Sequence, residues 1–302
     1  MLDICLCGTG GTMPLKNRHL ASAILRLEGR SVLIDCGEGT QIALKEAGFR
    51  FKPIDVICFT HFHADHISGI PGLLLTMGNE GREDPVEIIG PPGIGKVVNS
   101  LRIIAPELPF EVKFTEISED GEKLNLSGFD ITAFNLRHRC ACLGFRFDIQ
   151  RCGKFDVERA KLLPIPVYMW GKLQNGESVS YEGKIYNPSD VLGDERSGIS
   201  VAYCTDSRPC DNIIKYANGA DLLICEGMFG EDEKRERAVE TGHMTMAEAA
   251  EIAEKSGVKK LVLTHFSTSL QNPDDYKECI REIFPETYMG YDGYFLTLNF
   301  ED

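Results

Sequence analysis

Four side chains that can bind a metal ion stand close together in the segment THFHADH. The segment begins at the end of VICFT, an apolar run that predicts a buried strand, so the four side chains leave that strand together. Alternation along an extended chain places His61 and His63 on one side, and Asp65 and His66 turn back at the start of the next helix. Zinc accepts imidazole nitrogens and carboxylate oxygens as ligands. The segment therefore predicts half of a site for two metal ions.

Three further candidate ligands stand where other apolar runs end. His138 follows FDITAFNLR, Asp206 follows SVAYCT, and His265 follows KKLVLT. A single histidine is most often a hydrogen-bonded structural residue, but three strand-end residues in addition to THFHADH favour a metal site. Hydrolysis by a water that two metals share is the chemistry that such a site supports. Mixed histidine and aspartate ligands do not separate Zn²⁺ from Mn²⁺ or Fe²⁺.

Strands and helices alternate in both halves of the sequence. The helix expected at 245–256 has the clearest limits, with Thr245 and Glu248 as a capping box and Gly257 at its end. The charged segment GEDEKRERAVE is interpreted as a solvated loop. We expect the other helices near 38–47, 93–103, 209–217 and 273–283, and one through HISGIPGLLLTMG. This order predicts an α/β protein built as a four-layer α/β/β/α sandwich, with the candidate ligands along one edge.

Residues 151–198 interrupt this pattern, so we expect a single domain over 1–302 that carries them as an inserted arm. Residues 151–172 contain five basic and two acidic side chains, together with Tyr168 and Trp170, the single tryptophan. The two aromatic rings could stack on sugars or bases. A packed excursion anchored by Trp170, or a contact within a dimer, explains the same composition equally well.

The composition limits the classes of function. The chain has 302 residues with 32 basic and 46 acidic side chains, a net charge of −14. This charge argues against a general nucleic-acid binder, although it allows a local basic patch or phosphate binding through metals. The eleven cysteines indicate reduced core thiols, and the pairs Cys5/Cys7 and Cys140/Cys142 do not complete a thiolate zinc site. No apolar run reaches the length of a membrane span and a strand begins near Met1, so we expect a cytosolic protein without a signal peptide.

The pattern H-x-H-x-D-H after a strand resembles the metallo-β-lactamase superfamily, and the resemblance covers nearly the whole chain. The implied fold is the metallo-β-lactamase sandwich with an inserted arm. The resemblance also implies two Zn²⁺ per chain, roughly 3.5–4 Å apart, which lower the pKa of a shared water towards ~7. The implied ligands are His61, His63 and His138 for one zinc and Asp65, His66 and His265 for the other, with Asp206 as the bridge.

Further segments resemble the ribonuclease Z family, in the same order from about residue 2 to 270. They are GTGGTMPLKNR, DCGEGTQ, HISGIPGLL, GKLQNG, TDSRPCD, GHMT and LTHFST. That family removes the 3′ trailer from precursor tRNA, so the resemblance implies a cytoplasmic homodimer with precursor tRNA as its partner. A hydroxide held by the metals and oriented by Asp65 would attack phosphorus, while His243 paired with Glu226 would protonate the leaving oxygen. The arm would hold the tRNA elbow through its candidate contacts Lys161, Trp170 and Lys172.

The sequence departs from the ribonuclease Z pattern at positions that concern substrate handling. Met244 stands where the family commonly has Ser, His19 stands where it commonly has Asn, and the arm is leaner in Gly and Lys. Thr268, Ser269 and Leu270 stand where the family commonly has an Arg. These departures support a second hypothesis, a hydrolase of small phosphodiesters or other esters whose arm serves dimerisation. A third hypothesis, a non-catalytic metal-binding or scaffold protein, would predict a missing ligand.

Overall fold

Two compact units make up the computed structural model. The described residues are 1–194, 196–230 and 234–301. The larger unit comprises Met1–Asp148 and Ser200–Leu298, and the smaller one comprises Ile149–Ile199 and Asn299–Asp302. The larger unit holds two seven-stranded sheets and all the predicted metal ligands.

The first sheet joins an antiparallel half to a parallel half. Its strands are, in spatial order, β16 (Tyr294–Leu298), β1 (Leu2–Gly8), β2 (Ser22–Leu27), β3 (Arg30–Ile34), β4 (Ile54–Cys58), β5 (Val86–Gly90) and β6 (Val112–Glu116). β3 to β6 run parallel, whereas β1 pairs antiparallel with β2 and β16. The carboxyl ends of the parallel strands therefore meet at one edge, and THFHADH leaves β4 at this edge.

The second sheet has the same mixed design. Its strands are, in spatial order, β15 (Thr287–Met289), β14 (Leu261–Thr264), β13 (Leu222–Glu226), β12 (Ile199–Cys204), β9 (Leu143–Ile149), β8 (Phe129–Asn135) and β7 (Glu122–Leu126). β12 to β15 run parallel. Cys204 is in register with Cys225, and Glu226 is in register with Thr264. Asp206, Glu226 and His265 consequently lie at the same edge of this sheet.

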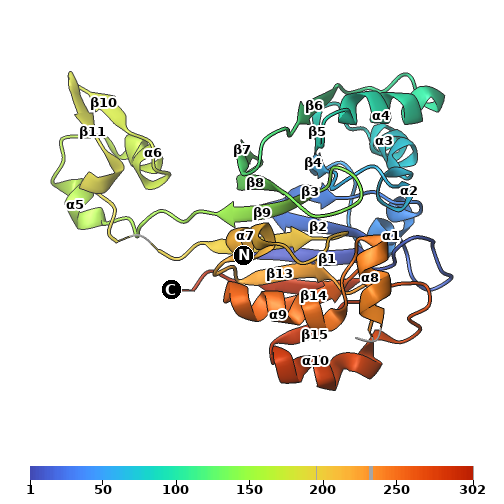
Figure 1. The fold of residues 1–302 in the computed structure, drawn as a ribbon. Helices are drawn as coiled ribbons and strands as arrows, with labels where there is room; N and C mark the ends of the chain where they lie inside the picture. The colour runs from blue at the N-terminus through green and yellow to red at the C-terminus, as the bar shows by residue number, and fades with distance from the viewer. Residues whose placement is uncertain (195, 231–233, 302) are drawn as a thin grey trace. The chain divides into compact units, whose positions relative to one another are not determined.

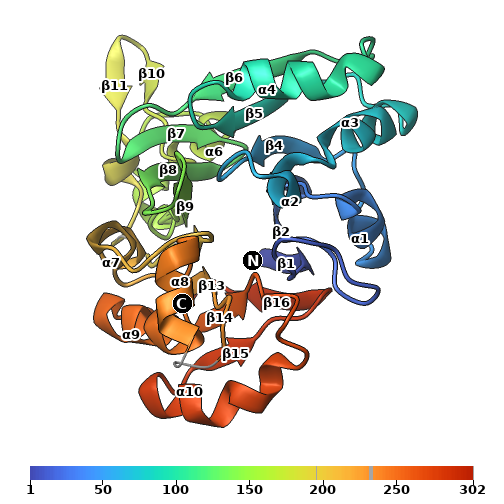
Figure 2. The ribbon, with the colours of Figure 1, turned by 45° about the vertical axis from the view of Figure 1, so that its right-hand side comes forward.

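Helices cover the outer face of each sheet (Figures 1 and 2). Ile24 of β2 shares an apolar cluster with Leu44 of a first group of helices, and Leu223 of β13 shares another with Ala249 of a second group. Leu25, which points to the opposite side of β2 from Ile24, is also fully buried. Burial on both faces confirms the predicted α/β/β/α sandwich. The first group is α1 (Thr40–Glu46), α2 (Ala64–Ile67), α3 (Ile70–Asn79) and α4 (Ile94–Leu101); the second is α7 (Asp211–Ala217), α8 (Arg235–Thr241), α9 (Met246–Ser256) and α10 (Lys277–Ile283).

The helix α9 has the limits that its sequence predicts. The Thr245 hydroxyl accepts from the Glu248 N–H at 3.2 Å, and the Glu248 carboxylate accepts from the Thr245 N–H at 3.0 Å. Gly257 ends the helix with a left-handed φ of 61°, which glycine adopts without a Cβ clash. The helix therefore starts at a fixed residue, directly after the segment that carries His243.

One prediction is wrong. The charged segment 230–240 was interpreted as a loop, but α8 forms over Arg235–Thr241; residues 231–233 lie outside the described part. Ala238 is the buried residue of this helix and belongs to a small apolar cluster with Met228 and Phe229, so the helix has little apolar contact with the interior. The short strands β7, β15 and β16 were not predicted. No described helix has the length and apolar character that a membrane crossing requires.

The smaller unit is made of short elements around an apolar cluster of its own. These elements are α5 (Val157–Lys161), α6 (Trp170–Gln174), β10 (Val179–Tyr181) and β11 (Lys184–Tyr186), with short 3-10 turns at Val167–Met169 and Pro188–Asp190. Leu173 and Tyr186 are buried in the cluster, and Trp170 packs against it. At its base, the Gly193 N–H donates to the Lys154 carbonyl at 2.8 Å. The residues assigned to the inserted arm thus pack among themselves.

Candidate metal centre

The structure brings all seven predicted ligands together at the shared edge of the two sheets. Groups of side chains whose ligand atoms lie within 4.8 Å of one another include the set His61, His63 and His138 and the set Asp65, His66 and His265. These are the two sets that the family resemblance assigns to separate metals.

Asp206 lies between the two sets, with one carboxylate oxygen facing each. Its Oδ2 is 3.6 Å from His61 Nε2 and 3.9 Å from His138 Nε2. Its Oδ1 is 3.2 Å from His66 Nε2 and 3.1 Å from His265 Nε2. A carboxylate so placed can bridge two cations, one through each oxygen.

The backbone is strained where ligands leave the strands. Asp206 follows β12 with a φ of 54°, and His265 follows β14 with a φ of 57°. Non-glycine residues in this left-handed region cost of order 1–3 kcal/mol, and such strain is concentrated at functional sites. The unusual backbone turns both side chains toward the centre.

Burial and charge favour a cation at this place. His61 is fully buried, and its Nε2 has no hydrogen-bond partner among the described residues. Burial, and then the nearby His66, lowers the pKa of His61 to about 2, so its imidazole is neutral and keeps a free lone pair. Burial raises the pKa of Asp206, but the surrounding imidazoles, His265 first, lower it well below its usual value. Neutral imidazole and ionised carboxylate are the protonation states that bind metals.

A second layer of hydrogen bonds fixes how the histidines point. Asp35, which follows β3, accepts from His66 Nδ1 at 2.8 Å and from the Thr60 hydroxyl at 2.9 Å. The Thr60 oxygen is in turn 3.0 Å from His61 Nδ1, and the Gly242 carbonyl is 3.0 Å from His138 Nδ1. These contacts leave the Nε2 atoms directed at the centre. Asp35 and Thr60 were missed as functional residues, although DCGEGTQ after an apolar run was a signal for Asp35.

The glycine-rich loop after β1 closes over the second ligand set. The Thr12 N–H donates to Asp65 Oδ2 at 2.7 Å. A Cβ on Gly11 would lie 2.6 Å from the His265 ring, so only glycine fits there. Asp292 anchors the loop by accepting from the Thr9 N–H at 2.9 Å and from its hydroxyl at 2.8 Å. The loop therefore holds Asp65 in place and narrows the approach to His265.

His243 and Glu226 form a pair beside the centre. His243 Nδ1 is 3.2 Å from Glu226 Oε1, and its Nε2 is 4.0 Å from Asp206 Oδ2. Glu226 is fully buried and also accepts from the N–H groups of Ser207 and Met244, at 2.6 and 3.2 Å. Burial lowers the pKa of His243, but the Glu226 carboxylate outweighs burial and raises this pKa to about 9. His243 is therefore protonated at neutral pH, with its Nε2–H directed at the centre.

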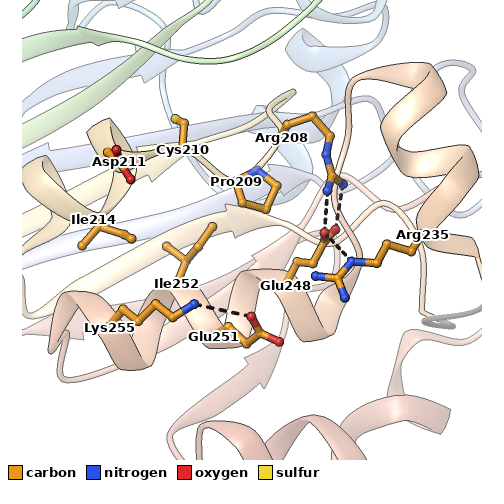
Figure 3. A pocket seen from close by; sticks show the side chains of 10 residues that line it. All are labelled: Arg208, Pro209, Cys210, Asp211, Ile214, Arg235, Glu248, Glu251, Ile252 and Lys255. Carbon is orange, nitrogen blue, oxygen red and sulfur yellow. Dashed lines mark hydrogen bonds and ion pairs between the residues drawn. The ribbon is translucent and has the colours of Figure 1, made fainter.

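A surface pocket next to α9 contains the side chains that fix the first turn of this helix (Figure 3). Arg208 reaches from the loop after β12 and donates to the His243 carbonyl at 2.6 Å and to Glu248 at 2.8 Å. Arg235 of α8 donates to the same Glu248 at 3.0 Å from the other side. Two guanidinium groups thus fix the first turn of α9 through one carboxylate. Both guanidinium groups are paired with Glu248, so the residues of this pocket support the candidate metal centre.

The positions that depart from the family pattern do not join the ligand groups. Met244 is fully buried in the apolar cluster under α9. His19 lies 3.3 Å from the exposed Glu46. Leu270 is buried, and its carbonyl, together with that of Ser267, accepts from Arg18, at 2.8 and 3.2 Å.

The predicted arm contacts have different environments. Lys161 is exposed and pairs with Glu158 at 2.7 Å, and Lys172 is exposed. Trp170 is half-buried, with its ring 5.8 Å from that of Phe155. Their contact with a substrate stays a prediction.

The cysteines form no disulfides, and one of them lies unexpectedly among the predicted metal ligands. None of the eleven forms a disulfide, and seven are buried. Cys140 is exposed and belongs to the ligand group of His61, His63 and His138. This mixed group was not predicted, because the spacing of cysteines along the sequence indicates only sites made of several thiolates.

Comparisons with known proteins agree with the fold. Residues 2–148 match the family described as anti-Pycsar protein Apyc1, and residues 173–266 match the beta-lactamase superfamily domain. The short form of human tRNase Z has a TM-score of 0.70 at 24% identity, covering 98% of this chain and 99% of that chain. The metallo-β-lactamase fold protein YhfI from Bacillus subtilis has a TM-score of 0.71 at 21% identity, with 98% of each chain covered. These two structures share the fold.

Relatives in sequence identify the family of this chain more narrowly than the solved structures do. The ribonuclease Z of Agathobacter rectalis is 54% identical over 302 residues, with 100% of each chain covered. The ribonuclease Z of Clostridium acetobutylicum is 46% identical over 308 residues, again with 100% of each chain covered. Because this similarity extends along the full length, the chain belongs to the ribonuclease Z family of the metallo-β-lactamase superfamily.

Proposed function

We propose that the protein is a zinc-dependent endoribonuclease that removes the 3′ trailer from precursor tRNA. The observation that carries the proposal is the placement of Asp206 between two histidine-rich ligand sets, with the His243–Glu226 pair beside it. Full-length relatives that are named ribonuclease Z support the same substrate.

The donor groups fit two divalent cations per chain. The fit rests on the unpartnered Nε2 of the buried His61 and on the ionised carboxylate of Asp206 among four imidazoles. Zn²⁺ suits nitrogen and oxygen donors of this kind, and Mn²⁺ or Fe²⁺ would suit them as well. When bound, the two metals supply Lewis-acid activation of the scissile phosphate and of the attacking water.

The chain's own residues position the reactants and move the proton. Asp65, held by the Thr12 N–H, orients the attacking water. His243 donates a proton from Nε2 to the departing 3′-bridging oxygen, and Glu226 stabilises the imidazolium before that transfer through its contact with Nδ1. Arg208 keeps this pair in position through the His243 carbonyl.

The arm at about 151–198, within the single domain, is proposed to bind the tRNA. Lys161 and Lys172 are accessible for phosphate contacts, whereas Trp170 contributes mainly to the packing of the arm. The family resemblance supports a homodimer in the cytoplasm.

A hydrolase of small phosphodiesters or other esters, with the arm used for dimerisation, is the alternative. The apolar side chains of Leu162, Val167 and Tyr168, exposed by 84%, 69% and 76%, favour a protein contact over a phosphate contact. This alternative keeps the same metal centre and changes only the role of the arm.

Trimming the arm separates the two functions. The Gly193 N–H and the Lys154 carbonyl are hydrogen-bonded, so a short Gly-rich linker can replace residues 156–191 without spanning a gap. We expect the trimmed protein to lose precursor tRNA cleavage and to keep hydrolysis of a chromogenic phosphodiester. Retained tRNA cleavage would show that the arm does not bind the substrate, and a loss of both activities with intact metal content would also contradict the assignment.

A further inference from the structure

Cys140 lies next to the predicted ligands of the first metal. It belongs to the connection between β8 and β9, two residues after His138, and its side chain is exposed. Its Sγ is 3.9 Å from His63 Nε2. One ligand atom from each of His61, His63, His138 and Cys140 lies within 4.8 Å of the others.

The spacing of this group allows its members to share one cation. Zinc bonds of about 2.0–2.3 Å place neighbouring ligand atoms roughly 3.5 Å apart. His138 Nε2 and His63 Nδ1 are 3.5 Å apart, so His63 faces His138 with Nδ1. The Cys140 sulfur contacts Nε2 of the same ring and must move toward the Nδ1 side to reach the metal, which its exposed connecting segment allows.

A second observation points to a cation at the same place. His61 Nε2 is fully buried and makes no hydrogen bond to a described residue, since Asp206 Oδ2 is 3.6 Å away, while the Nδ1 of that ring contacts the Thr60 hydroxyl at 3.0 Å. A buried nitrogen that lacks a hydrogen bond is costly unless another electrophile takes its lone pair. His61 Nε2 belongs to the ligand group that contains Cys140.

We propose that Cys140 is a further protein ligand of the metal that His61, His63 and His138 hold, in addition to the bridging Asp206. As the sulfur–metal bond forms, the thiol loses its proton to the solvent. A soft thiolate makes this site favour thiophilic metals. The inference rests on the proposed metal centre and does not depend on the RNA substrate.

Another role for Cys140 makes a different prediction. His63 faces His138 with Nδ1, so its Nε2–H can donate to the Cys140 sulfur 3.9 Å away, and the sulfur would then only orient the ring. In that arrangement sulfur makes no bond to the metal. Spectroscopy distinguishes the two roles directly.

Cobalt reports on the ligands of the first site without any measurement of activity. Metal-free full-length protein is titrated with Co²⁺ alone, and the visible ligand-field bands report binding while a near-ultraviolet charge-transfer band reports a thiolate ligand. We expect the charge-transfer band in the wild type and its loss in Cys140→Ala and in Cys140→Ser, with the ligand-field bands kept. Cys142→Ala is the matched control, because Cys142 is buried two residues away with its Sγ 3.7 Å from the Thr205 carbonyl, and it should keep the band.

The possible results of the cobalt titration can be told apart. Ligand-field bands without a charge-transfer band in the wild type, or a band that persists in both Cys140 variants, overturns the thiolate assignment and leaves the metal centre intact. Absence of both kinds of band in the wild type overturns the metal centre and the thiolate together. Circular dichroism of each variant checks that the fold is retained.

Discussion

Replacing Glu226 by Gln tests how the protein keeps His243 protonated. The carboxylate lies 3.2 Å from His243 Nδ1 and raises the pKa of His243 to about 9, despite the opposing effect of burial. Glutamine keeps the size of the side chain and one acceptor oxygen but removes the charge. The pKa of His243 should then fall to about 6.5 or lower, which corresponds to a loss of about 3 kcal/mol in the stability of the imidazolium.

The effect on cleavage depends on pH in a defined way. A group whose pKa is raised is protonated below that pKa, so the acid form of His243 is present in the wild type up to about pH 9 and is lost above it. At pH 8 about nine tenths of the wild type but only about 3% of the variant would carry the proton, a difference of about thirtyfold in rate. At pH 6 the two rates should differ by less than about twofold. Bound metals lower the pKa of His243 in the wild type and in the variant alike. The prediction therefore concerns the difference between these two pKa values.

Single-turnover cleavage of precursor tRNA between pH 6 and 10, at saturating metal, measures this difference in the pKa of His243. Glu251→Gln is the control, because Glu251 is a half-buried residue of α9 that pairs with Lys255 at 3.6 Å and contacts neither His243 nor Glu226 in the described structure. Its profile should match that of the wild type. Parallel profiles for Glu226→Gln and the wild type, differing by a constant factor at every pH, would refute the proposed role of the carboxylate.

Three further substitutions test residues that bridge the predicted metals or hold the side chains around them. Asp35→Asn removes the charge that orients His66 from 2.8 Å and should weaken metal binding about 10–100-fold in a chelator competition, while an unchanged affinity would show that His66 is held by other contacts. Asp206→Asn should reduce bound metal from two equivalents to one or none by elemental analysis; two retained equivalents would argue against a bridging role. Arg208→Ala leaves the His243 carbonyl and Glu248 without this donor and should lower the free energy of unfolding by about 1–3 kcal/mol in urea titrations, which a value near zero would contradict.

That the seven predicted ligands lie close together was predictable from the sequence, because each stands at or shortly after the end of an apolar run. In parallel strands the carboxyl ends meet at one edge, so Asp206 and His265 had to lie near each other once their strands were identified. The limits of α9 were predictable for a similar reason, since the capping box and Gly257 act within a few residues. Local signals of this kind need no knowledge of the tertiary fold.

Contacts between distant segments were not predictable. The strand β16 pairs with β1 across nearly the whole chain, and its short sequence carries no signal of its own. Asp35 is 31 residues from His66, and the position of Cys140 among histidines depends on how the segment after β8 folds back. The helix α8 also escaped prediction, because the buried Ala238 is its one link to the apolar interior.

Cleavage of a 3′-extended precursor tRNA by the zinc-loaded protein and by its His243→Ala variant tests the central claim most directly. The wild type should release the trailer at one position, after the discriminator base, and leave a 3′ hydroxyl. The variant should bind the same amount of metal and cleave about 10²–10⁴-fold more slowly, since only its proton donor is removed. A metal-loaded wild type that leaves the precursor intact, or a variant that cleaves it at the full rate, would contradict the account.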